Sequence, residues 1–282
     1  MTKRSSLPVL FRPIWLVSGC VVISLVWSFW VLSPGFIQLD HFSALVTFLL
    51  SAFNPAVSYQ AEFVPIGTDP LLLKACKAAG TTVVFAGAGL SLALLVGIPL
   101  GFLCSTSFWQ GIRDRPMLLP VATFCYSIGR IVITFFRSVH ELLWAVLFLA
   151  AFGLTESGAA LAIAIPYAGI FAKVFSDMID ECPTDSSNAL RESGASTLQS
   201  FLFGRLPRAL PDMAAYSMYR FECAVRSSAV LGFFGIPTLG FYVSASFENL
   251  YYRKVWTYLY VLFVLLLILD IWSNMLREGL AR

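Results

Sequence analysis

Hydrophobic and polar positions alternate along this chain on the scale of whole helices rather than of single turns. Apolar runs of about 19 to 25 residues, each long enough to cross a hydrocarbon layer of about 30 Å, are separated by short polar segments. These runs predict about six membrane-spanning helices. The six runs cover residues 14–32, 80–104, 128–152, 159–179, 209–231 and 255–275.

The segments between the first runs carry their own signals. Residues 36–53 have an amphipathic pattern, which favours a position on the membrane surface. Residues 71–79 predict a lead-in helix before the second span, and Pro99 predicts a kink near the end of that span. Small residues let membrane helices approach closely, so the glycines of the second span predict a place at the centre of the bundle. These glycines are Gly87, Gly89, Gly97 and Gly101.

The apolar stretch 116–153 is too long for one span, because it would form a helix of about 57 Å. We therefore divide it into an interfacial part at 117–127 and a third span at 128–152. The segment 232–254, rich in glycine at its start, is predicted to be an external loop. Its L-G-F-F-G-I-P-T-L-G-F run lacks the G-K-[ST] ending of a phosphate-binding loop, and its glycines predict a tight return of the chain.

A polar island at 181–211 is the longest water-compatible segment in the last two thirds of the chain. Its pattern predicts a helix at 188–193, a break at Gly194 and a second helix at 196–203. Both helices are too short to be stable alone, so they need a partner surface. Leu190, Leu198, Phe201 and Leu202 form the predicted apolar stripe, and Arg191, Glu192, Arg205 and Arg208 the predicted solvent face.

Composition excludes a soluble globular protein, because 58% of the residues are hydrophobic, 12% are charged and the mean hydropathy is +0.79. The chain is therefore predicted to be an all-α polytopic membrane protein. A net charge of +3 gives no indication of nucleic-acid binding. Basic residues are concentrated in the segments predicted to lie inside, which predicts that both termini are cytoplasmic. With two histidines, on separate segments, the sequence predicts no metal site and no cofactor.

Ionisable residues inside the spans are costly and need partners or a water-filled path. Arg137 and Glu141 are four positions apart in the third run, and Glu222 and Arg226 in the fifth, so each pair is predicted to meet on one helical face. Arg220 is predicted to point elsewhere. Two interpretations stay open: these spans line a polar pathway, or their charges form structural ion pairs.

The polar island resembles the cytoplasmic loop of bacterial ABC importer permeases. N-A-L-R-E-S-G, nine residues and G-R-L-P correspond to the pattern E-A-A, three residues, G, nine residues, I, one residue, L-P. Asn188 replaces the usual Glu, and Gly204 the usual Ile. The resemblance implies that the loop at 182–208 docks on an ATPase subunit. The implied coupling residues are Asn188, Ala189, Leu190, Arg191, Glu192, Gly194, Ala195, Leu206 and Pro207.

Two further stretches narrow the family. F-F-R-S-V-H-E-L-L-W-A (135–145) and Y-R-F-E-C-A-V-R-S-S-A-V-L-G (219–232) are similar to stretches of phosphonate and phosphite permease subunits, with His140 in place of a proline. The resemblance implies the type I ABC importer permease fold of the methionine permeases, with a core at 71–282 behind an anchor helix and external segment at 1–70. The implied pathway residues are Arg137, Ser138, Glu141, Arg220, Glu222, Arg226 and Ser227.

Such a permease is a transport subunit and not an enzyme, because ATP is hydrolysed by a separate partner. The resemblance implies two cytoplasmic ATPase subunits, an external substrate-binding protein, a second copy of the chain and membrane lipid as partners. It implies a multi-pass protein of the bacterial cytoplasmic membrane. The alternatives are a permease for methionine or another small nutrient or oxyanion, a membrane enzyme using Glu141, His140, Asp177 or Asp180, and a scaffold that transports nothing.

Overall fold

The computed structural model describes residues 11–32, 39–60, 67–109, 117–153 and 155–280, and all regular structure in them is helical. The chain forms two compact units, Met1–Asn54 and Pro55–Arg282. The first holds α1 (Phe11–Leu32), α2 (Leu39–Leu50) and the short η1 (Ser51–Phe53). The predicted division into an anchor helix with an external segment at 1–70 and a permease core at 71–282 stays a prediction.

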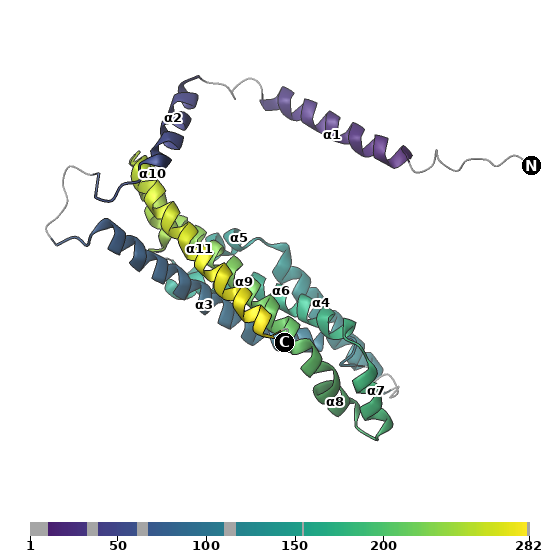
Figure 1. Ribbon diagram of the computed structural model, residues 1–282. Coiled ribbons are helices and arrows are strands. Elements are labelled where there is room, and N and C mark those ends of the chain that lie inside the picture. Colours follow the sequence, from purple (N-terminus) through teal and green to yellow (C-terminus); the bar gives the residue numbers. More distant parts are fainter. Residues whose placement is uncertain (1–10, 33–38, 61–66, 110–116, 154, 281–282) are drawn as a thin grey trace, which may run out of the picture. The chain divides into compact units, whose positions relative to one another are not determined.

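The second unit is a bundle of long helices with short helical segments at its two ends (Figure 1). Figure 1 shows α7 and α8 at one end, hereafter the α7 end, and α10 at the other, hereafter the α10 end. The elements are α3 (Leu71–Leu103), α4 (Leu119–Ser138), α5 (Glu141–Phe152), α6 (Glu156–Glu181), α7 (Asp185–Glu192), α8 (Thr197–Ser200), the π-helical η3 (Phe201–Arg205), α9 (Leu206–Leu231), η4 (Gly232–Phe234), α10 (Leu239–Glu248) and α11 (Tyr252–Leu280).

Four helices in the described part of the chain are long and apolar enough to cross a membrane, or five if the segments 197–234 and 239–248, which meet at 43°, form one broken span. The predicted fourth and sixth spans correspond to α6 and α11. The predicted lead-in helix and second span are one unbroken helix, α3, and Pro99 does not interrupt it. The predicted number of six spans is not confirmed, because only 17–28 of α1 have described side chains and they form a shorter apolar helix.

The core forms where α3 crosses α6. A methyl group at Gly89 would lie 2.8 Å from Ile163 Cβ, and one at Gly97 would lie 2.8 Å from Phe171 Cβ, so both glycines are needed for this approach. Gly101 lies similarly close to α6, whereas Gly87 faces open space. The predicted close packing of α3 is therefore confirmed, but the central helix is α6. Its apolar window is 72% buried, against 33% for α3.

The predicted third span, 128–152, is wrong. The chain is helical through Ser138, becomes extended at Val139 and His140, and begins a new helix at Glu141. The His140 side chain accepts a hydrogen bond from the Leu142 backbone N–H (3.3 Å) and so satisfies a free donor at the start of α5. Hydropathy did not locate this break, because apolar residues lie on both sides of it. The predicted interfacial part at 117–127 is also wrong, since most of it belongs to the first half of α4.

The predicted external loop at 232–254 is mostly helical and contains α10. A methyl group at Gly240 would lie 1.9 Å from the Ala229 carbonyl oxygen, so the chain crosses itself in direct backbone contact here. Gly235, at φ 96°, supplies the left-handed turn before this crossing. The Leu239 backbone N–H donates to the Thr82 hydroxyl (3.1 Å), which ties α10 to α3. The predicted tight return is thus confirmed, although it is followed by a helix.

Candidate functional site

The 182–208 loop lies at the α7 end and has a defined local structure. Thr184 occupies the N-cap position of α7, where its hydroxyl accepts a hydrogen bond from the Asn188 side-chain amide (3.3 Å). Gly194, at φ 90°, ends this helical segment, and the Ala195 backbone N–H returns to the Leu190 carbonyl (3.0 Å). The predicted break at Gly194 is therefore confirmed. The helix itself begins three residues earlier than predicted, at Asp185.

The second half of the loop begins at a capping box. The Ser196 hydroxyl accepts from the Gln199 backbone N–H (3.3 Å), and the Gln199 side chain accepts from the Ser196 backbone N–H (2.9 Å). From here α8 runs through the π-helical turn at 201–205 directly into α9. The predicted separate helix at 196–203 is therefore wrong. A helix tolerates a proline in its first turn, so Pro207 marks the start of α9 without breaking the chain's helical path.

The two halves of the loop pack directly on each other. The Ser187 and Ser200 hydroxyls are 2.8 Å apart, and the Ser200 hydroxyl donates to the Ser187 carbonyl (2.5 Å). A methyl group at Gly204 would lie 2.9 Å from Ser187 Cα, so the position that usually carries Ile in similar permeases has no room for a side chain here. Gly204 thus allows α7 to contact the π-helical turn.

Arg205 was predicted to lie on the solvent face of the loop, and this prediction is wrong. Only 6% of the residue is exposed, and its guanidinium donates to the Ser107 hydroxyl. Phe201 is buried as well. Its ring packs edge-on against Phe102, with 6.0 Å between the ring centroids, and against Phe108, with 5.5 Å. Both side chains point away from solvent because the turn at 105–109, about one hundred residues earlier in the chain, covers them.

A carboxylate at the end of α6 holds that same turn. Asp180 Oδ1 accepts from the Ser105 hydroxyl (2.6 Å) and from the backbone N–H (3.0 Å) and hydroxyl (2.6 Å) of Ser107. Asp180 Oδ2 accepts from the backbone N–H and the hydroxyl of Thr106 (both 2.9 Å). We call Asp180, Ser105, Thr106, Ser107 and Arg205 the serine clamp. Sequence reasoning missed it, because none of its bonds joins residues that are close along the chain.

The implied coupling residues occupy the outer surface of the loop. Asn188, Ala189, Arg191, Glu192, Gly194 and Pro207 are exposed, whereas Leu190, Ala195 and Leu206 are half-buried. An exposed face backed by a buried polar interior gives the rigid surface that a docking partner needs. The structure therefore brings these residues together, and their role in docking stays a prediction.

Arg220 on α9 is enclosed by aromatic rings. Its Nε donates to the Tyr216 hydroxyl (2.7 Å), and its guanidinium carbon lies 5.3 to 5.8 Å from the ring centroids of three tyrosines, Tyr167, Tyr216 and Tyr219. No acidic side chain forms an ion pair with it among the described residues. Tyrosine rings stabilise a cation while leaving its charge uncompensated. The predicted separate direction of Arg220 is confirmed.

The other predicted charge pairs differ from each other. Arg226 and Glu222 pair as predicted, at 2.5 Å. The Arg137–Glu141 pair was predicted wrongly, because the break at Val139–His140 puts these residues on different helices. Glu141 instead accepts from the Ser227 hydroxyl (2.9 Å) and lies 3.7 Å from the His140 imidazole.

That contact joins α5 to α9. Ser227 also lies 3.2 Å from the Tyr167 hydroxyl on α6. Arg137 and Ser138 are exposed at the end of α4, and the Ser138 hydroxyl donates to the Phe135 carbonyl of its own helix (2.8 Å). The structure therefore brings Glu141 and Ser227 together, but it does not bring Arg137 to Glu141.

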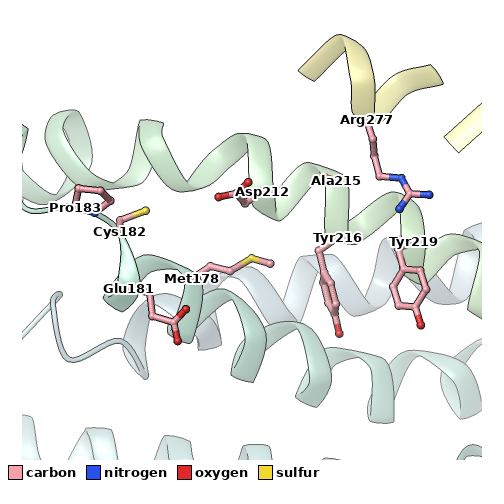
Figure 2. Close-up of a pocket in the computed structure, with 9 residues that line it drawn as sticks. All are labelled: Met178, Glu181, Cys182, Pro183, Asp212, Ala215, Tyr216, Tyr219 and Arg277. Atoms are coloured by element: carbon pink, nitrogen blue, oxygen red, sulfur yellow. The ribbon is translucent and has the colours of Figure 1, made fainter. Parts of the chain in front are cut away.

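An open hollow of about 620 Å³ lies between the end of α6, the first half of α9 and the end of α11 (Figure 2). Figure 2 shows Tyr216 and Tyr219 side by side on α9, with Arg277 approaching from α11. Tyr216 lines the hollow and also accepts the hydrogen bond of Arg220, so the hollow borders on the tyrosine-enclosed cation. The lining residues are Met178, Glu181, Cys182, Pro183, Asp212, Ala215, Tyr216, Tyr219 and Arg277.

The lining of the hollow includes one thiol, that of Cys182. Burial, reinforced by the nearby Asp212 carboxylate, raises the pKa of the Cys182 thiol above its usual value, so this sulfur stays protonated and a poor nucleophile at neutral pH. The described residues contain no group of three or more His, Cys, Asp or Glu side chains that could hold a metal ion.

Comparison with known proteins gives one family over most of the chain. Residues 97–282 match the family described as "Binding-protein-dependent transport system inner membrane component". A phosphate-import permease protein, PhnE, of Mycolicibacterium smegmatis is 29% identical over 197 residues, which are 70% of this chain and 35% of that protein. The phosphite transport system permease protein PtxC of Stutzerimonas stutzeri is 29% identical over 153 residues, which are 54% of this chain and 56% of that protein.

The chain thus matches about a third to somewhat over half of the length of these two relatives. Among solved structures, a chain of the MetNI methionine ABC transporter in an inward-facing conformation is similar, with a TM-score of 0.63 and 19% identity over 76% of this chain and 100% of that chain. This similarity confirms the predicted type I importer permease fold.

Proposed function

The chain belongs to the family of inner-membrane components of binding-protein-dependent transport systems, and from this premise we propose that it is the permease subunit of an ATP-driven importer for phosphonate or phosphite. In this proposal two copies of the chain form the pathway across the bacterial cytoplasmic membrane, with both termini in the cytoplasm. Two cytoplasmic ATPase subunits bind the 182–208 loops, and an external binding protein delivers the substrate. The chain itself catalyses no covalent reaction.

The surface at the α7 end supports the coupling part of this proposal. The exposed residues Asn188, Arg191 and Glu192 lie on a helix whose other side is fixed to the bundle through Ser187 and Gly204. Because the helix is fixed in this way, a displacement caused by a docked ATPase subunit is passed on to the bundle and does not only deform the loop. Asn188 carries no charge, so docking through this position relies on hydrogen bonds and shape.

The single observation that carries the substrate proposal is the unpaired cation beside the hollow. Arg220 keeps its positive charge within three tyrosine rings, next to a space large enough for a small oxyanion. A guanidinium binds phosphorus oxyanions through parallel N–H···O bonds. The names of the two relatives, which concern phosphate import and phosphite transport, agree with a phosphorus oxyanion as the substrate.

Growth on defined phosphorus sources tests this function. A deletion strain, with and without the gene restored, is offered methylphosphonate, phosphite or phosphate as the sole phosphorus source. We expect growth on methylphosphonate or phosphite to be lost and then restored by the gene. Equal growth of both strains on all three sources contradicts the proposed substrate class. Growth on methionine as the sole sulfur source then tests the alternative of a methionine permease.

A further inference from the structure

We propose that Asp180 is the positioning residue that ties the coupling loop to α3 and thereby sets how many substrate molecules are transported per ATP. This inference rests on the proposed function as an ATP-driven importer. It concerns the serine clamp, whose members were not among the residues that the sequence assigned to coupling.

The clamp lies between the docking surface and the rest of the bundle. Asp180 is in the last turn of α6, directly before the 182–208 loop, yet its carboxylate binds the turn that follows α3. The bonds from Ser105 and Ser107 to Asp180 span 75 and 73 positions of the sequence. A displacement of the end of α6 therefore reaches the end of α3 through this carboxylate.

Both ends of the coupling loop converge on one hydroxyl group. Ser107 donates to Asp180, which directly precedes the loop, and accepts from Arg205, which lies near its end. Ser107 and Arg205 are 4% and 6% exposed, so water does not replace either partner easily. Because the loop is fastened at both ends to the same residue, it cannot tilt without carrying the 105–107 turn along.

An apolar contact reinforces this connection. Phe201, in the π-helical turn, lies between Phe102 at the end of α3 and Phe108 after the clamp. The Trp109 indole N–H donates to the Leu103 carbonyl (2.7 Å) and holds the turn against α3. The remaining space among the loop, the turn and Arg205 is about 10 Å³, no more than one water needs. The loop, the turn and the end of α3 therefore form one packed unit.

The charge of Asp180 is essential to this unit. Its two oxygens accept five hydrogen bonds, and bonds to an ionised acceptor are about twice as strong as neutral ones. An asparagine at this position would replace one acceptor oxygen by an NH₂ donor. This donor would point at N–H or O–H groups, which are donors too, so hydrogen bonds would be lost. Asp180→Asn therefore loosens the unit while keeping nearly the same size and shape.

The test uses the complete importer, purified with its ATPase subunits, reconstituted in liposomes and supplied with its binding protein, with phosphite as the probe. We measure assembly by co-purification, ATP hydrolysis, and phosphite taken up per ATP. For Asp180→Asn we expect normal assembly and basal ATP hydrolysis, and a fall of about tenfold or more in phosphite per ATP. Ser107→Ala, which removes only the shared hydroxyl, should reduce the same ratio by a smaller factor.

Asp177→Asn is the matched control. It makes the same chemical change one turn earlier on α6, where the carboxylate pairs with Lys173 of its own helix and forms no hydrogen bond or ion pair with another described segment. We expect its phosphite-to-ATP ratio to equal that of the wild type. A positioning role lowers the ratio for Asp180→Asn, whereas a role in folding alone lowers assembly, ATP hydrolysis and uptake together.

The outcomes separate the two proposals. Wild-type complex that takes up neither phosphite nor methylphosphonate in the presence of ATP contradicts the proposed function, and the positioning role with it. Wild-type uptake together with an unchanged ratio in both Asp180→Asn and Ser107→Ala contradicts the positioning role alone. Should Asp180→Asn fail to assemble, the ratio for Ser107→Ala decides: a reduced ratio supports the positioning role and a normal ratio overturns it.

Discussion

The serine clamp and the charges on α9 are two polar regions of one helical bundle, and they are bonded in opposite ways. In the clamp, the bond between Arg205 and Ser107 joins positions 98 residues apart, and those of Asp180 join positions 73 to 75 apart. On α9, Arg220 bonds to Tyr216 and Arg226 to Glu222, each four residues earlier on the same helix. Arginine and carboxylate groups thus join distant segments in the serine clamp and neighbouring turns of one helix on α9.

Bonds between distant segments fix helices relative to one another, whereas bonds within one turn leave a helix free to move with its charges satisfied. The α7 end is therefore stiff where a partner would apply force. Around Arg220, the hydrogen bonds of the charged groups lie within α9 itself, so these bonds do not hold α9 to its neighbours. An alternating-access transporter requires this combination of a rigid input and an adjustable pathway.

The largest effect is expected where stiffness depends on the absence of a side chain. Gly204→Ala places a methyl group 2.9 Å from Ser187 Cα, a backbone atom that cannot move aside. We expect it to destabilise the docked form of the loop by about 2 kcal/mol, and hence to weaken binding to the ATPase subunit by about 30-fold. Affinity of the solubilised permease for that subunit measures this effect.

Gly194→Ala is the control for this change within the same loop. Its methyl group would meet nothing within 4 Å, so only the backbone at φ 90° opposes it, at about 1 kcal/mol. We expect a loss of affinity of about fivefold. Equal losses for the two variants would show that the packing of α7 on the π-helical turn does not support docking.

A second prediction compares two arginines with the same local bonds. Arg220→Gln removes the cation beside the hollow, and we expect phosphite uptake to fall at least about tenfold while assembly with the ATPase is kept, because an oxyanion loses its charged partner. Arg130 likewise donates to a tyrosine hydroxyl four residues earlier (Tyr126, 3.0 Å), with its guanidinium 5.3 Å from the ring centroid, but on α4.

Arg130→Gln should therefore change uptake by less than about threefold, while its effect on thermal stability matches that of Arg220→Gln. Uptake and thermal unfolding of the two variants are measured side by side. If both lose uptake to the same degree, the arginine–tyrosine pairs act as structural groups, and the pathway role of Arg220 is contradicted.

The smallest effect concerns the contact between α5 and α9. Ser227→Ala removes the donor to Glu141 and leaves a half-buried carboxylate oxygen short of one partner, which costs about 1 kcal/mol. We expect the apparent Tm to fall by about 2–4 °C. Ser138→Ala is the control, because it removes a hydroxyl that donates to a carbonyl of its own helix, and we expect its Tm to be unchanged. An equal fall in Tm for both variants would show that Ser227 does not stabilise the contact between α5 and α9.

The sequence predicted those features that depend on neighbours along the chain. The bounds of α6 and α11 follow apolar runs ended by polar residues, and the break at Gly194 follows from the need for a left-handed residue. The pair of Glu222 and Arg226 follows from helical spacing. Each of these features depends on residues that are close along the chain, so the composition and periodicity of the sequence are enough to predict it.

Other features depended on partners far away in the sequence. Arg205 was assigned to solvent because its only visible neighbours are polar, and its burial results from a turn near residue 107. The five donors to Asp180 were hidden for the same reason. The break before Glu141 did leave a local signal, since S-V-H-E offers a capping side chain, but the apolar residues around it outweighed that signal.

The unbroken helix α3 has a further consequence for the lipid that surrounds the protein. Its 33 residues extend over about 50 Å, well beyond a hydrocarbon layer of about 30 Å. Its backbone groups are bonded within the helix, so its uncharged residues after Lys77 are tolerated in acyl chains or in the headgroup layer. A bilayer that becomes a few ångströms thicker or thinner therefore only shifts its boundary along α3, and the resulting hydrophobic mismatch stays small. A change in acyl-chain length with growth temperature therefore leaves this one helix matched to its bilayer without any change of sequence.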